Sequence, residues 1–219
     1  MSKKIYSLSG AVCLLIALVF VLGSQEEAKR ELNQNGIPDQ ASSTNKLKGN
    51  IRAELEVFNF DEAVTRADLI AKVQIERAIK EIDEPSPKTL YQASVLELLK
   101  GDEGLVNRTI DILQQGNSTW SFNNNTMFGQ GDEYFLFLNK ATVSNTYWIL
   151  GEETGMYEVI DDGRIEKKSL YLDELTDIED KVSTEMFKKN QKEVKDIQIL
   201  YENKFMNKIV EQLNKNRSE

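Results

Sequence analysis

The 219-residue chain has no histidine and a single cysteine, Cys13. Without histidine it has no serine–histidine–acid triad, no imidazole general base and no imidazole metal ligand. One cysteine forms no internal disulfide, so a conventional hydrophobic core must stabilise the folded part. The sequence also has no glycine-rich phosphate loop, no dinucleotide fingerprint and no calcium-loop pattern. We therefore expect neither a cofactor nor a tightly bound metal ion.

An apolar block near the N-terminus follows Lys3 and Lys4. Residues 5–22 carry no charge, which is the lower limit for a membrane-spanning helix, whereas the apolar centre 11–22 has the length of a signal-peptide core. The residues around Gly23 match a cleavage site only loosely, so we favour an uncleaved anchor over residues 1–24 and keep cleavage as the alternative. The two lysines should stay in the cytoplasm. We expect a single-pass protein of the cell membrane with the bulk of the chain extracytoplasmic, or a secreted one if the segment is cleaved.

Three further regions follow the N-terminal segment. Residues 25–50 are polar, contain Gly36 and Pro38, and are predicted to form a linker. Residues 51–170 carry short apolar runs separated by turn residues, which predict a domain of about seven strands after a short helix at 61–67. Residues 171–219 have helical periodicity and are predicted to form a C-terminal helical appendage.

The predicted strands differ in how their apolar residues are spaced. Leu69–Ile75 alternates apolar with polar residues, which is typical of a strand with one face in water. In Leu90–Leu99 the apolar positions change between odd and even near Val95 and Leu96, which predicts a β-bulge or a sharp coil there. Glu133–Leu138 has apolar residues at both odd and even positions, as in a strand that is covered on both faces. The remaining strands are expected at 109–115, 147–150, 156–160 and 164–166, with a hairpin turn at 161–163.

These elements predict an α+β protein in which an antiparallel β-barrel or sandwich precedes one or two amphipathic helices. The C-terminal apolar stripe has two interpretations, packing on the domain itself or docking a protein partner. We favour a split, with Leu175–Val182 docked on the barrel and the part from Val194 onward only partly covered. The stripe consists of Leu175, Ile178, Val182, Met186, Val194, Ile197, Tyr201, Phe205, Ile209 and Leu213.

The order of four segments also resembles that of a known family; the segments are Val95–Asp102, Ile110–Gly116, Gly131–Leu138 and Gly155–Val159. It resembles the small exported, membrane-anchored β-barrel domains of Gram-positive bacteria that have no assigned activity, whose outline is similar to OB-like and netrin-like barrels. The resemblance covers residues 67–165 and implies a barrel. It implies no catalytic residue, and the cysteines of netrin-like inhibitors are absent.

Exposed aromatic residues are the candidate contacts with a partner. Trp120 and Phe122 lie in the polar stretch 116–130, whereas Trp148 lies inside an expected strand and is predicted to belong to the core. Tyr201 and Phe205, on the C-terminal stripe, are the candidate contacts for a protein that docks on the helix.

Paired carboxylates are the alternative chemistry, since two acids can act as general acid and base. The doublets Asp132–Glu133, Glu152–Glu153 and Asp161–Asp162 each lie at an expected turn or strand edge, and we interpret them as solvated turns. Without Lys3 and Lys4 the formal charge of −9 becomes −11, which argues against nucleic acid as a ligand. The sequence thus favours a membrane-anchored extracytoplasmic binding module without catalytic activity over an extracytoplasmic hydrolase using paired carboxylates.

Overall fold

The computed structural model describes residues 49–142, 146–167, 169–190 and 196–218. The predicted membrane helix at 1–24 lies outside these residues, as does the predicted linker except for Gly49 and Asn50. All of the described residues belong to one compact unit. No helix within the described ranges has both the length and the apolar character needed to cross a membrane.

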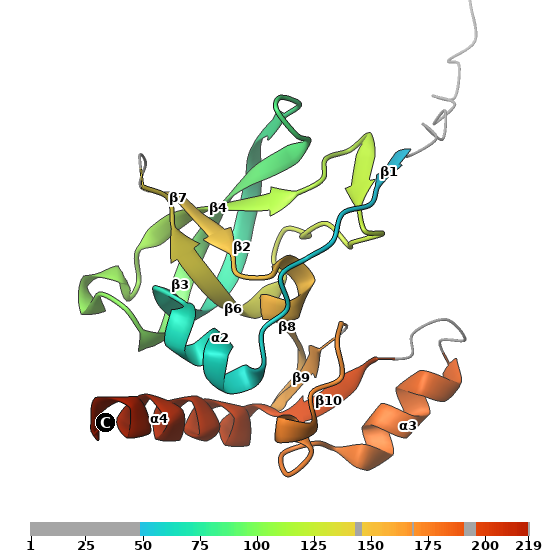
Figure 1. The fold of residues 1–219 in the computed structure, drawn as a ribbon. Coiled ribbons are helices and arrows are strands. Elements are labelled where there is room, and N and C mark those ends of the chain that lie inside the picture. Colours follow the sequence, from blue (N-terminus) through green and yellow to red (C-terminus); the bar gives the residue numbers. More distant parts are fainter. Residues whose placement is uncertain (1–48, 143–145, 168, 191–195, 219) are drawn as a thin grey trace, which may run out of the picture. The chain divides into compact units, whose positions relative to one another are not determined.

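Five strands close into a small barrel (Figure 1). The order around the barrel is β2, β3, β4, β7 and β6, and β6 pairs with β2 again. Only β4 and β7 run parallel to each other within it. The protein is α+β as predicted, although five strands rather than about seven form the barrel. The strands are β2 (Leu69–Ile82), β3 (Lys88–Lys100), β4 (Thr109–Gln115), β6 (Glu133–Lys140) and β7 (Thr146–Ile149).

The other strands lie outside the barrel. β8, β9 and β10 extend the sheet outward from β6, and β10 is its last strand. The predicted hairpin is present, with Asp161 of β8 paired with Arg164 of β9. β1 and β5 form a separate parallel pair in which Gly49 lies opposite Trp120. These strands are β1 (Gly49–Ile51), β5 (Trp120–Phe122), β8 (Met156–Asp161), β9 (Arg164–Lys167) and β10 (Gln198–Tyr201).

The parity change near Val95 is a β-bulge, which is one of the two predicted alternatives. Glu97 pairs with Lys72 and Val95 pairs with Val73, so Leu96 has no counterpart on β2. A bulge bends its strand and increases the local twist. The bend helps β3 to curve around a barrel of few strands.

β6 divides the interior into two cores, and its prediction as a strand buried on both faces is confirmed. Tyr134, Leu136 and Leu138 point into the barrel, while Phe135 and Phe137 point to the opposite side. We call the first cluster the barrel core; it consists of Leu69, Ala71, Val73, Ile75, Tyr91, Ala93, Val95, Ile110, Ile112, Phe128, Tyr134, Leu136, Leu138, Tyr147, Ile149 and Met156. We call the second the outer core; it consists of Phe58, Phe60, Val64, Ala67, Ile70, Phe135, Phe137, Leu150, Tyr157, Ile165, Leu172, Leu175, Ile178, Leu200, Phe205 and Ile209.

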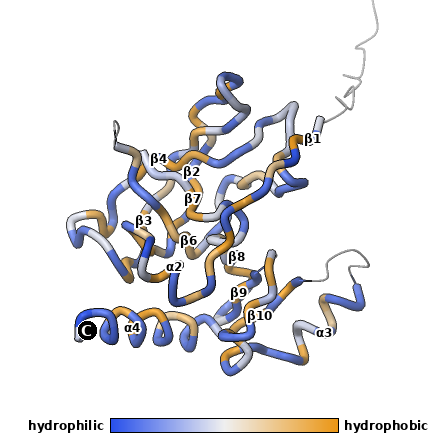
Figure 2. The backbone as a smooth tube through the Cα atoms, in the orientation of Figure 1, coloured by the Kyte–Doolittle hydropathy of each residue, from blue (hydrophilic) through white to orange (hydrophobic). Residues whose placement is uncertain are grey.

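Two helices cover the outer core. α2 (Phe60–Arg66) begins with a capping box, in which the Glu62 amide donates to Asn59 Oδ1 at 2.8 Å and the Asn59 amide to Glu62 Oε2 at 3.3 Å. α4 (Glu202–Ser218) runs below the sheet (Figure 1), and its hydrophobic and hydrophilic residues alternate along the tube in Figure 2. Phe205 and Ile209 are its fully buried side chains.

The C-terminal segment is part of the domain core, which corrects the predicted appendage and the predicted split of the stripe. Residues 198–201 form the strand β10 instead of a helix, and Ile197, Ile199 and Leu200 are fully buried. Ile197 and Tyr201 are four residues apart, which is also the spacing of one helical turn. In the structure, however, the backbone of β10 forms its hydrogen bonds with β9 in the sheet. The Phe205 ring contacts Tyr157 at a centroid distance of 4.5 Å, deep in the outer core.

The far edge of β10 is covered by the chain that precedes α3. The Tyr201 amide donates to the Ile178 carbonyl at 3.0 Å, and the Asp180 amide donates to the Ile199 carbonyl at 2.7 Å. Glu179 also forms a β-bridge with Leu200. These bonds leave little of the β10 edge open to another strand.

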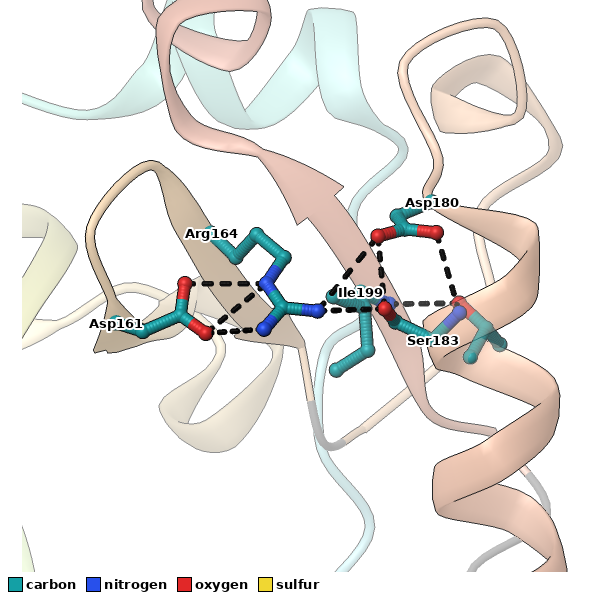
Figure 3. Close-up of polar contacts among 6 residues, drawn as sticks. Asp161, Arg164, Asp180, Ser183 and Ile199 are labelled. Carbon is teal, nitrogen blue, oxygen red and sulfur yellow. Dashed lines mark hydrogen bonds and ion pairs between the residues drawn. The ribbon is translucent and has the colours of Figure 1, made fainter.

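α3 (Lys181–Asn190) is held by polar contacts (Figure 3). Asp180 accepts from the Ser183 amide at 3.1 Å, and Arg164 Nη1 donates to Ser183 Oγ at 2.6 Å while its other nitrogens bind Asp161. Thr184 Oγ1 accepts from the Ile199 amide at 3.0 Å. The predicted core-facing residues of this helix, Val182 and Met186, are 72% and 58% exposed, because these polar bonds turn the Ser183–Thr184 side inward.

Candidate functional site

An open groove of about 350 Å³ lies where the chain entering α2 passes the end of β7. The extended residues 55–58 form one wall, and β7 with the turn after it forms the other. Short pieces of β4, β5, β6 and α2 complete the lining. The lining residues are Leu55, Glu56, Phe58, Arg66, Gln115, Phe122, Asn139, Trp148, Ile149, Leu150, Gly151 and Glu152.

Trp148 is the main exposed aromatic side chain of the groove. It was predicted to be a core residue because it lies inside a strand, but it is 42% exposed. Tyr147 and Ile149 point into the barrel, so the alternation of a strand directs Trp148 to the opposite face. The position inside the strand was predicted well, and the side on which the ring lies was not.

Phe58 and Arg66 form one end of the groove. The Arg66 guanidinium lies 4.8 Å from the centroid of the Phe58 ring and donates to Glu56 Oε1 at 3.0 Å. α2 holds Arg66 in its last turn, where a cation is favoured by the helix dipole. The single cation among the lining residues thus already has a carboxylate and an aromatic ring as partners.

The turn after β7 has an unusual backbone. Gly151 and Glu152 both have left-handed φ values, 67° and 51°. A side chain at Gly151 would meet Thr154 Oγ1 and would come within 3.2 Å of the Glu56 carbonyl, so only glycine allows the two walls to approach here. Glu152 starts η3 (Glu152–Gly155), and a left-handed non-glycine residue costs on the order of 1–3 kcal/mol. Such strain is often found at functional sites.

Glu152 has an altered protonation equilibrium. Although the residue as a whole is half-buried, burial of its carboxyl raises its pKa to about 7. The nearby Glu153 carboxylate acts in the same direction, while a hydrogen bond from the Gln115 backbone and the charge of Lys88 oppose the rise. At neutral pH this carboxyl is therefore partly protonated, unlike an exposed glutamate.

Lys167 anchors the same turn from the other side. Its side chain is fully buried, donates to the Thr154 carbonyl at 2.9 Å, and lies 4.9 Å from the Tyr157 ring centroid. Burial lowers the Lys167 pKa to about 7, with the Glu153 carboxylate opposing the change. The Thr154 amide and hydroxyl in turn donate to the Gly151 carbonyl, at 3.1 and 2.8 Å. Lys167 thus fixes the turn that carries Glu152.

The aromatic residues predicted as partner contacts do not form one site. Phe122 is half-buried and lines the groove with Trp148, whereas Trp120 is exposed but covers Gly49. Tyr201 is exposed on β10, with the Lys204 ammonium 4.5 Å from its ring centroid. Phe205 is fully buried, so its expected contact with a partner is wrong: the ring is needed by the outer core.

Two of the three acidic doublets lie together in a second open depression of about 410 Å³. Lys72 lies among these acids, 2.8 Å from Glu202 and 3.5 Å from Glu133. Glu152–Glu153 is not part of the depression. The acidic residues that line the depression are Asp132, Glu133, Glu158, Asp161, Asp162 and Glu202. Within the described residues, no group of three or more histidine, cysteine, aspartate or glutamate side chains could hold a metal ion.

Sequence reasoning missed Phe58, Arg66 and Glu152 as neighbours of Phe122 and Trp148. These residues come from four separate segments, and no spacing in the sequence joins them. No family model matches this chain, and no curated protein matches it. The function is therefore inferred from the geometry of the groove and from the sequence itself.

Proposed function

We propose that the protein is a non-enzymatic binding module that is held at the outer face of the cell membrane by its N-terminal segment and takes a ligand in the groove. The observation that carries the proposal is the exposed Trp148 ring in a cavity of about 350 Å³. Ligand sites in proteins have volumes of roughly 300–1,000 Å³ and combine aromatic walls with a few polar groups. Phe122 supplies further aromatic surface, and the polar residues Gln115 and Asn139 also line the groove.

One feature of the sequence supports the outer location, and one feature of the structure supports the barrel type. The charge-free residues 5–22 follow Lys3 and Lys4, which favours an anchor whose following chain is exported. The five-stranded barrel supports the OB-like outline inferred from the order of the segments. The location is tested by cell fractionation with externally added protease. A membrane-bound protein whose C-terminus is digested is expected, and a protein found only in the cytosolic fraction would contradict it.

The two tryptophans allow a direct test of the groove. In Trp120→Phe the remaining tryptophan, Trp148, reports on the groove, while Trp148→Phe retains only Trp120 outside it. The full chain in dodecyl maltoside is titrated with amines, sugars, carboxylates and short peptides while tryptophan emission is recorded. At least one class is expected to change the emission of Trp120→Phe saturably and that of Trp148→Phe little. If no class does so, the proposal fails.

A specific observation also favours a hydrolase as the second candidate. Glu56 and Glu152 line the same groove, and a carboxyl with a pKa of about 7 suits a general acid. The two candidates differ in turnover. Hydrolysis of a bound compound that is lost in Glu152→Gln without loss of binding would establish the enzyme; binding without turnover supports the module.

A further inference from the structure

The groove combines aromatic rings with carboxylates. Trp148 and Phe122 supply the rings that a ligand can reach, since Phe58 is buried and already lies under Arg66. Glu56 and Glu152 supply the acids. A cation is attracted to the face of an aromatic ring and to a carboxylate, and quaternary ammonium groups are commonly recognised by rings together with acids. Resting on the proposed function, we propose that the ligand class of the groove is an organic cation whose ammonium group sits between Trp148 and the carboxyl of Glu152.

Charge complementarity selects a cation over a neutral or anionic ligand. Arg66, the one cation among the lining residues, is already paired with Glu56 at 3.0 Å and stacked on Phe58. Within the lining, the Glu152 carboxyl accepts from the backbone of Gln115 and has no cation beside it; the charge of Lys88, which is not a lining residue, acts on it as well. The chain as a whole carries a formal charge of −9, which attracts cations from solution.

Burial of Glu152 makes the binding proton-linked. The groups that act on its carboxyl are Glu153 in the same turn, the Gln115 backbone in β4 and Lys88 in β3, with Glu56 and Arg66 on the opposite wall. A bound ammonium group stabilises the carboxylate and therefore releases the proton that the empty groove retains. With a pKa of about 7, the ionised fraction changes about tenfold between pH 6 and pH 8, and affinity for the cation changes with it.

Choline and its neutral isostere 3,3-dimethylbutan-1-ol form the matched probe pair, because they have the same shape and differ in charge. Both are titrated into full-length Trp120→Phe in dodecyl maltoside while Trp148 emission is followed. We expect choline to bind about tenfold or more tightly than the alcohol at pH 8. Its dissociation constant should rise about tenfold from pH 8 to pH 6, with protons released on binding in weakly buffered solution.

The second variant is Glu152→Gln in the Trp120→Phe background, with Glu54→Gln as the control. Glu54 is exposed and lies outside the groove, so its loss removes the same charge without touching the site. Glu152→Gln should abolish the preference for choline and its pH dependence, while Glu54→Gln should keep both. Because the pH titration uses an intact Glu152, it tests the inference even if Glu152→Gln folds poorly.

The outcomes separate the two proposals. Equal affinity for choline and the alcohol, or a choline affinity that does not change between pH 6 and pH 8, overturns the organic cation and leaves the binding module intact. Binding of a sugar or a carboxylate at Trp148 without binding of choline does the same. A Trp148 emission that no probe class changes overturns both.

Discussion

The two sides of β6 are built in different ways. Apart from Phe128, the barrel core takes its residues from strands that follow one another within residues 69–156. The outer core joins Phe60 of α2 to Phe205 and Ile209 of α4, which lie about 145 residues further along the chain. Within it, the Phe205 ring contacts four other aromatic rings. A local sequence pattern therefore suffices to predict the first core, whereas the second exists only when the C-terminus has returned to the sheet.

The largest expected effect is that of Phe205→Ala. Its ring is fully buried and contacts Phe60, Phe135, Phe137 and Tyr157, so truncation should cost about 3–5 kcal/mol of the free energy of unfolding. Urea denaturation measures the loss. Val210→Ala, on the exposed side of the same helix, is the control and should stay within about 0.5 kcal/mol of wild type. Equal effects would show that α4 does not complete the outer core.

Lys167 should make stability increase with pH on the alkaline side. Its pKa is about 7 in the folded protein and 10.5 when exposed, so between these values the unfolded chain binds more protons and stability rises with pH. Each pKa unit corresponds to about 1.4 kcal/mol. Lys167→Met should remove this rise, as measured by urea denaturation at pH 7, 8 and 9. Lys215→Met, at an exposed position of α4, should keep it. If the stability of Lys167→Met still rises with pH, Lys167 is not the group responsible for the rise.

Glu152 should have the opposite and smaller effect. Its pKa is raised from 4.5 to about 7, so the folded protein binds more protons in this interval and stability falls as the pH rises through it. In Glu152→Gln the free energy of unfolding should decrease less between pH 5 and pH 7 than in the wild type. Urea denaturation at these pH values measures the difference. Together with Lys167, Glu152 gives a stability minimum near neutral pH. An unchanged slope in the variant would contradict the burial of this carboxyl.

The smallest effect is expected at α3. Val182 and Met186 are mostly exposed, so Val182→Ala with Met186→Ala should change the free energy of unfolding by about 0.5 kcal/mol or less. Thr184→Val is the informative counterpart, because it leaves the buried Ile199 amide without its 3.0 Å acceptor and should cost about 1–3 kcal/mol. Thermal unfolding distinguishes the two. A larger loss from the double alanine variant would mean that the apolar side of α3 packs inward.

The sequence predicts much of the barrel and little of the site. β4 was predicted with its observed bounds, and both the bulge at Leu96 and the two-sided burial of β6 follow from the parity of apolar residues. The outer core was missed because Ile197–Tyr201 satisfies a helical spacing as well as a strand. Trp148 was assigned to the wrong side because strand membership does not determine the side on which a ring lies.

The groove was harder to predict from the sequence than the barrel. Its walls meet at Gly151, where the backbone of residues 55–58 comes close to the turn after β7. That approach depends on the tertiary path of the chain, as does the burial that changes the pKa of Glu152. The left-handed Gly151 was visible in the sequence only as one glycine among 12.

The position of β10 at the sheet edge has a consequence for biogenesis. A chain synthesised from its N-terminus can close the barrel once β7 is available. The edge of β9 and the sides of the Phe135 and Phe137 rings that contact Phe205 stay uncovered until residues 198–209 arrive. During that interval the nascent domain presents an open strand edge beside an aromatic surface, the combination that promotes aggregation. Ribosomes stalled or messages truncated before residue 198 should therefore yield a species that chaperones and proteases recognise, although its barrel is already formed.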